Sequence, residues 1–79
     1  MGKRTGAGDA VRVPRALKGR RCVINTKAGG AFRGVLWRGG RDYVVAKQAE
    51  ILEPGGRMRP LDGELLVFTA EVDFVQLLS

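Results

Sequence analysis

The sequence RCVINTKAGGAFRGVLWRGGRDYVVAKQAEIL, residues 21–52, carries the strongest structural signal in this 79-residue chain. Its first segment alternates between apolar and polar residues, which is typical of a half-buried β-strand. The Gly-rich sequences at 28–30 and 39–40 are hairpin-turn signals, and they separate three segments rich in β-branched residues. The stretch therefore predicts three antiparallel strands at residues 21–27, 31–38 and 43–52.

Two further strands are expected downstream. Residues 53–60, EPGGRMRP, are predicted to form a loop because of their Pro and Gly content. Residues 61–69 and 72–78 are rich in Leu, Val and Phe, and only a very short turn fits between them. The chain therefore predicts five strands in all.

The N-terminal region adds a tail and a short helix to this plan. Residues 1–9 are small, polar and basic, and we expect a flexible tail there, ahead of a single domain over 10–79. Residues 14–18 can form just over one helical turn, since Pro14 suits a first helical position and Gly19 suits the stop. The expected fold is all-β: a short N-terminal helix and five strongly bent antiparallel strands that close a small barrel.

The interior of this barrel can be named in part. Strand alternation places Ile24, Phe32, Leu36 and Val67 inside. Gly34 weakens the strand in which it lies unless it allows a bend or a close backbone approach. A small barrel needs such bends, so Gly34 favours this architecture.

The last two strands are apolar on both faces. Leu65, Leu66, Val67 and Phe68 are consecutive, and residues 72–78 show apolar side chains on either side, whereas a half-buried antiparallel strand alternates. We therefore expect a second subunit to cover one surface; the alternative is that barrel curvature and the helix cover both faces within one chain. The expected oligomer-interface residues are Leu66, Phe68, Val72 and Phe74.

Composition restricts the chemistry. The chain has 14 Lys+Arg against 8 Asp+Glu, which suits phosphate binding or is ordinary solubility charge. It has no His and one Cys, so an intrachain disulfide, a zinc site and a His-dependent catalytic group are not expected. Cys22 is expected to be a small core residue. We expect no enzyme activity, metal or cofactor, no membrane span, and a cytoplasmic location.

The order of elements resembles the Sm and Sm-like (LSm) family, whose members have a short helix followed by five bent strands. The match covers roughly residues 14–78. The segments that carry it are Pro14, Leu17 and Gly19; Cys22-x-Ile24-x-Thr26-x-x-Gly29; Phe32-x-Gly34-x-Leu36; Val44-x-Ala46-x-x-Ala49-Glu50; and residues 59–61, 65–68 and 72–78.

The resemblance implies assembly of identical subunits into a ring, a hexamer or a heptamer. It also draws attention to the uridine pocket of the family, which uses an Asp and an Asn around the turn between the second and third strands and an Arg-Gly pair between the fourth and fifth. In this sequence Gly39 and Tyr43 stand at the first two positions and Thr69-Ala70 at the third. The base-reading groups are therefore not kept.

Two function classes remain. The first is a ring that binds single-stranded RNA, or single-stranded DNA, weakly and with little sequence preference, because Tyr43 could stack a base while Arg38 and Arg41 hold phosphates. Its expected nucleic-acid-binding residues are Arg38, Arg41, Tyr43 and Thr69. The alternative is a structural or protein-interaction barrel with no nucleic-acid role, in which Tyr43 packs on a neighbour and the arginines are solvated.

Overall fold

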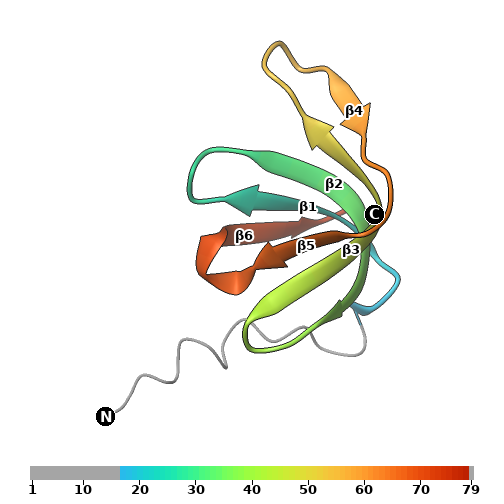
Figure 1. The fold of residues 1–79 in the computed structure, drawn as a ribbon, viewed down its shortest axis with the longest axis vertical. Coiled ribbons are helices and arrows are strands. Elements are labelled where there is room, and N and C mark those ends of the chain that lie inside the picture. The colour runs from blue at the N-terminus through green and yellow to red at the C-terminus, as the bar shows by residue number, and fades with distance from the viewer. Residues whose placement is uncertain (1–16, 79) are drawn as a thin grey trace.

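The computed structural model describes residues 17–78, which form one strongly bent antiparallel sheet (Figure 1). The all-β class expected from the sequence is confirmed. The predicted tail at 1–9 lies outside the described residues, as does most of the predicted helix at 14–18. The elements are β1 (Arg21–Thr26), β2 (Ala31–Gly39), β3 (Tyr43–Leu52), β4 (Met58–Pro60), β5 (Leu65–Phe68), the 3-10 helix η2 (Thr69–Glu71) and β6 (Val72–Leu77).

β3 is the strand around which the sheet is organised. It pairs along most of its length with β2, and on its other side its N-terminal half pairs with β5 and its C-terminal half with β4. β1 lies between β2 and β6. Among the described strands, β5 therefore pairs only with β3, and β6 pairs only with β1.

The bend in β3 centres on Gln48. Its backbone φ is 51°, in the left-handed region that residues with a side chain rarely adopt. The register between β2 and β3 shifts beside it, between Arg33 and Val35. Across the sheet, a Cβ at Gly34 would lie 3.0 Å from the carbonyl oxygen of Lys47. Glycine therefore suits this close backbone approach, which is one of the two roles that the sequence left open for Gly34.

The core lies inside the bend. Ile24, Leu36 and Val67 are buried, as expected from the sequence. Phe32 is only half-buried, contrary to expectation, because it pairs with Ile51 in the half of β3 that leads to β4, away from the half on which β5 lies. The buried cluster consists of Cys22, Ile24, Leu36, Val44, Ala46, Val67 and Val72, with Leu17 and Leu65 packed against it.

The region predicted as a loop at 53–60 contains a strand. Gly55 and Gly56 both have positive φ, and the tight turn that they form returns the chain at once along β3 as β4. Figure 1 shows this β3–β4 hairpin extending away from the other strands. The strand predicted over 61–69 begins only at β5, because the chain bends at Gly63, where φ is 78°. β4 therefore comes from the predicted loop at 53–60 and β5 from the predicted strand at 61–69, and the two pair with the two halves of β3.

Candidate functional site

Two turns that are distant in the sequence meet at one end of the sheet. They are residues 40–42, between β2 and β3, and residues 69–71, between β5 and β6, and we call them the turn pair. The Thr69 hydroxyl donates a hydrogen bond to the carbonyl oxygen of Arg41 at 2.8 Å. The Thr69 backbone N–H donates to the carbonyl oxygen of Asp42 at 2.9 Å. The two bonds hold the turns in one fixed arrangement.

All four residues predicted to contact nucleic acid lie at this end of the sheet. Arg41 is exposed within the turn pair, Tyr43 follows it, and Arg38 is exposed on β2 opposite Val45. Within residues 17–78, Arg38 has no ion-pair partner. The Thr69 hydroxyl proton is already used inside the turn pair. The Thr69 side chain is therefore structural, and Arg38, Arg41 and Tyr43 provide the exposed side chains at this end of the sheet.

Tyr43 connects the turn pair with the edge of the sheet. It is 38% exposed, and in the β3–β5 register it stands directly opposite Phe68, which is 61% exposed. Side chains of directly opposite residues in antiparallel strands have Cβ atoms about 4.5–5.5 Å apart. The side chains of Tyr43 and Phe68 are therefore cross-strand neighbours. This pair could not be predicted from the sequence, because it depends on the β3–β5 register.

The free edges of β5 and β6 carry large apolar side chains in contact with solvent. On β5 these are Leu66 and Phe68, and on β6 they are Phe74, Val75 and Leu77, with exposed fractions between 37% and 61%. Exposed apolar patches of this kind mark interaction surfaces. Val72, which the sequence placed in the interface, is 7% exposed and belongs to the core cluster of the chain. Val75 and Leu77 are exposed here although the interface predicted from the sequence did not include them.

Several other charged side chains form ion pairs or cation–π contacts within the chain. Arg33 pairs with Glu50 at 2.7 Å, and Arg59 pairs with Glu53 at 2.7 Å. Trp37 has the ammonium groups of Lys18 and Lys47 at 4.8 and 3.8 Å from its ring centre. Such contacts are cation–π interactions, which stabilise the fold locally. No short-range sequence pattern brings Trp37 and the two lysines together, so this contact could not be predicted from the sequence.

The described part of the chain offers little for other chemistry. Residues 17–78 contain no cluster of three or more His, Cys, Asp or Glu side chains that could hold a metal ion. Cys22 is buried, and desolvation raises the pKa of its thiol, which disfavours the nucleophilic thiolate. In the same residues no helix has the length and apolar content needed to cross a bilayer.

Comparison with known proteins places the fold. No protein-family model and no curated protein sequence matches the chain. Among solved structures, the chain superimposes on a heptameric archaeal Sm protein with a TM-score of 0.74 and 17% identity, over 82% of this chain and 94% of that one. It matches the SmAP1 heptamer of P. aerophilum with a TM-score of 0.73 and 16% identity, over 82% and 86% of the two chains. The chain therefore has the Sm-like fold expected from its motifs.

Proposed function

We propose that this Sm-like chain assembles into a closed ring of identical subunits and that the ring binds single-stranded nucleic acid, chiefly RNA, weakly and with little sequence preference. The observation that carries the proposal is the pair of free strand edges, β5 and β6, which are lined by exposed Leu, Val and Phe side chains. Both solved structures described above are heptamers of the same fold, which supports seven subunits here.

A ring is the expected assembly because the two free edges, β5 and β6, are different strands. If β5 of one subunit pairs with β6 of the next, the contact is heterologous, and it closes when the rotation between subunits divides a full turn. Burying a Phe or Leu side chain stabilises by about 1.5–3 kcal/mol. The exposed apolar side chains on the two edges therefore provide a substantial driving force, and pairing also removes two strand edges that would otherwise promote aggregation.

The nucleic-acid role rests on the turn pair. Arg38 and Arg41 are exposed cations beside Tyr43, so phosphate contacts and base stacking are available within a few residues. Repetition of a weak site around a ring raises the effective local concentration and so the overall affinity. Gly39, Tyr43 and Thr69 lack the groups with which the family reads uridine, so we expect little preference for that base.

Assembly is tested by light scattering coupled to size exclusion. Seven subunits of 8.6 kDa give a particle of about 60 kDa, and a closed ring keeps that mass on dilution over a wide range. A monodisperse species of 8.6 kDa at high concentration would refute the ring.

Binding is tested separately by titration of labelled single-stranded RNA and DNA oligomers at several salt concentrations. We expect Arg38→Ala to weaken binding of all sequences equally and to flatten the salt dependence by roughly one unit per lost phosphate contact. Tyr43→Ala should weaken binding by about 1–3 kcal/mol, whereas Tyr43→Phe should have little effect. Arg57→Ala is a matched control, since Arg57 is exposed in the β3–β4 turn. No binding at low salt would leave the protein-interaction alternative.

A further inference from the structure

Trp37, the only tryptophan of the chain, is the unpaired residue of a β-bulge in β2. Leu36 stands opposite Ala46, and Arg38 stands opposite Val45. Ala46 and Val45 are consecutive, so β3 offers no partner to Trp37. A bulge redirects a side chain out of the regular alternation of a strand, and bulges are frequent next to functional sites. The direction of the Trp37 side chain is therefore set by the bulge and not by alternation along β2.

Two lysines from different parts of the chain converge on the Trp37 ring. The ammonium nitrogen of Lys47, on β3, lies 3.8 Å from the ring centre, and that of Lys18, ahead of β1, lies 4.8 Å from it. Lys18 is held in place by its neighbour Gly19, whose N–H donates to the Leu36 carbonyl oxygen at 2.6 Å. The face of an aromatic ring attracts cations. Trp37 therefore holds two ammonium groups close together, although like charges repel.

Arg21 lies on the same face of the sheet as Lys47. Both stand opposite Val35, Arg21 from the β1 side and Lys47 from the β3 side. Directly opposite residues point to the same side of a sheet. Arg21 adjoins the core residue Cys22, and successive side chains of a strand alternate between the two faces. Arg21, Val35 and Lys47 therefore form a row across the outer face, the face turned away from the core.

Arg38 connects this row with the turn pair. It stands opposite Val45, which lies between the core residues Val44 and Ala46, so Arg38 also belongs to the outer face. We define the outer patch as Lys18, Arg21, Trp37, Arg38 and Lys47. Within residues 17–78, three of its four cations form no ion pair, and the fourth, Lys47, has one Glu64 oxygen at 3.8 Å. The patch therefore carries a net positive charge.

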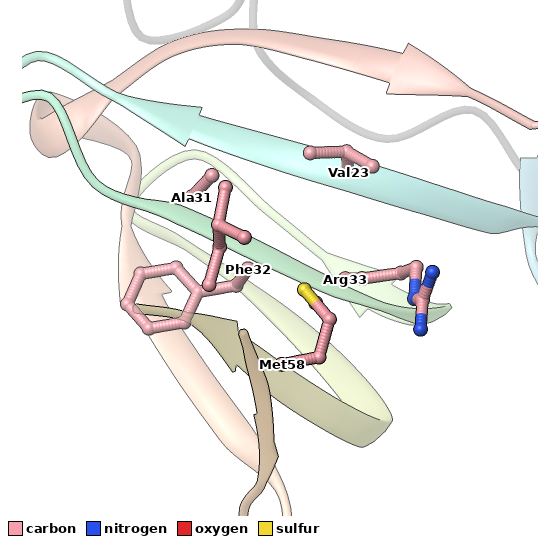
Figure 2. A pocket seen from close by; sticks show the side chains of 6 residues that line it. Val23, Ala31, Phe32, Arg33 and Met58 are labelled. Atoms are coloured by element: carbon pink, nitrogen blue, oxygen red, sulfur yellow. The ribbon is translucent and has the colours of Figure 1, made fainter. Parts of the chain in front are cut away.

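The outer patch ends at Arg33. The Arg33 guanidinium donates two hydrogen bonds to one oxygen of Glu50, at 3.0 and 2.7 Å, so these two side chains neutralise each other. Beyond Arg33 lies a small hollow whose other walls are apolar (Figure 2); they are formed by Val23, Ala31, Phe32, Leu52 and Met58. Positive charge without an ion-pair partner is therefore concentrated around Trp37, next to the turn pair.

We propose that the outer patch makes a second set of phosphate contacts with single-stranded nucleic acid, so that a strand bound at the turn pair continues across the outer face. The inference rests on the proposed nucleic-acid binding and extends it to residues outside the turn pair. Arg38 belongs to both surfaces, which makes them continuous. Several neighbouring cations suit a polyanion, because each phosphate that is contacted releases counterions.

The chemistry of the outer patch fits phosphate. An ammonium group binds phosphate as a point charge, and a guanidinium binds it through a bidentate fork. Trp37 is a positioning residue: its ring holds Lys18 and Lys47 before the ligand arrives, which lowers the entropic cost of ordering two long side chains. An acidic protein segment would meet the same charges, but it has no base to stack on Tyr43 at the adjoining turn pair.

Tryptophan fluorescence tests the site directly, because Trp37 is the only tryptophan. The full chain is titrated at low salt with a uridine trinucleotide and with a uridine dodecamer. The dodecamer should change the emission of Trp37, whereas the trinucleotide, which is too short to extend beyond the turn pair, should not. A glutamate dodecapeptide should change the emission only at a much higher concentration than the dodecamer.

Variants separate the outer patch from the turn pair. Lys18→Gln and Lys47→Gln should each weaken binding of a labelled dodecamer by about fivefold, the effect of one exposed charge contact, and lower its salt slope by roughly one unit. Both should leave the trinucleotide unaffected. Trp37→Leu should weaken the dodecamer and lower its salt slope, whereas Trp37→Phe, which keeps an aromatic face, should restore both. Arg57→Gln removes an exposed cation in the β3–β4 turn and is the control. Light scattering should give all variants the mass of the unmodified chain.

The results that would overturn the proposal differ from one another. If neither oligomer binds at low salt, the proposed nucleic-acid function fails and the outer patch fails with it. If Tyr43→Ala weakens the dodecamer while Lys18→Gln and Lys47→Gln do not, only the outer patch is refuted. If the glutamate dodecapeptide changes the emission at the same concentration as the dodecamer, the outer patch is a surface for acidic proteins instead.

Discussion

Strands β1 and β6 pair with each other, yet their apolar side chains differ in solvent exposure. On β1, Cys22 and Ile24 are 0% and 1% exposed. On β6, Phe74 is 53% exposed, and Val75 is 37% exposed although it stands directly opposite Ile24. β1 has a hydrogen-bonded neighbour on each side, whereas β6 has only β1 among the described strands. Apolar content alone therefore does not place a residue in the core: on β6, which has one paired neighbour, Phe74, Val75 and Leu77 stay exposed and Val72 is buried.

The largest expected effect separates these two strands directly. Ile24→Ala removes buried volume from the core, and we expect the free energy of unfolding to fall by about 3 kcal/mol. Phe74→Ser leaves the core of the subunit intact and should instead reduce the particle to 8.6 kDa with its β-sheet circular dichroism retained. Urea titration and light scattering at one subunit concentration measure both. Asp73→Ser, which changes an exposed polar residue, is the control on β6. If Ile24→Ala and Phe74→Ser lower the urea midpoint equally, the two strands do not differ in their contribution to the core.

A smaller effect is expected where β2 and β3 approach most closely. In Gly34→Ala the new methyl would lie 3.0 Å from the carbonyl oxygen of Lys47, a backbone atom that cannot move alone. Overpacking of this kind destabilises by typically 1–3 kcal/mol, and we expect about 2. Gly40→Ala is a matched control, since a Cβ there meets no atom within 4 Å. Equal urea midpoints for the two variants would show that β3 can shift away from β2.

Much of this architecture could be predicted from local pattern. Alternation located β1, β2 and β3 to within a residue or two, and Gly34 indicated a bend or a close backbone approach, of which the structure shows the second. The 53–60 region was assigned to a loop because Pro and Gly dominate it, and its pairing as β4 depends on a hairpin whose partner is β3. The burial of Val72 could not be predicted either, because it requires knowing that β6 bulges where Thr26 pairs with Val72.

A change at the bend of β3 should stabilise the protein. Gln48 has a positive φ, and glycine adopts that conformation without the steric cost that a side chain brings. Gln48→Gly is therefore expected to raise the free energy of unfolding by about 1 kcal/mol. Gln48→Val, with a β-branched side chain, should lower it. If both variants lower the unfolding midpoint, the left-handed backbone at residue 48 is not the source of strain.

The smallest effect concerns the turn pair. Thr69→Val keeps the shape of the side chain and removes the hydroxyl that donates to the Arg41 carbonyl oxygen. Because this bond is exposed, we expect a loss of only about 0.5–1 kcal/mol in the free energy of unfolding. Nucleic-acid affinity should fall slightly with it, since the turn that holds Arg41 loses one of its two links. Thr69→Ser keeps the hydroxyl and should leave both the free energy of unfolding and the nucleic-acid affinity unchanged. Unchanged stability in Thr69→Val would show that the hydroxyl hydrogen bond does not stabilise the turn pair.

The sequence by itself determined the strand class, the special backbone role of Gly34, the burial of Cys22 and Ile24, and the apolar character of the last two strands, because these properties depend on the residue pattern over a few positions. Only the tertiary structure decided which apolar side chains stay exposed, that the Thr69 hydroxyl donates to the Arg41 carbonyl oxygen, and that Phe68 stands opposite Tyr43. These features depend on which strands pair and in which register, and contacts between residues far apart in the chain set that register.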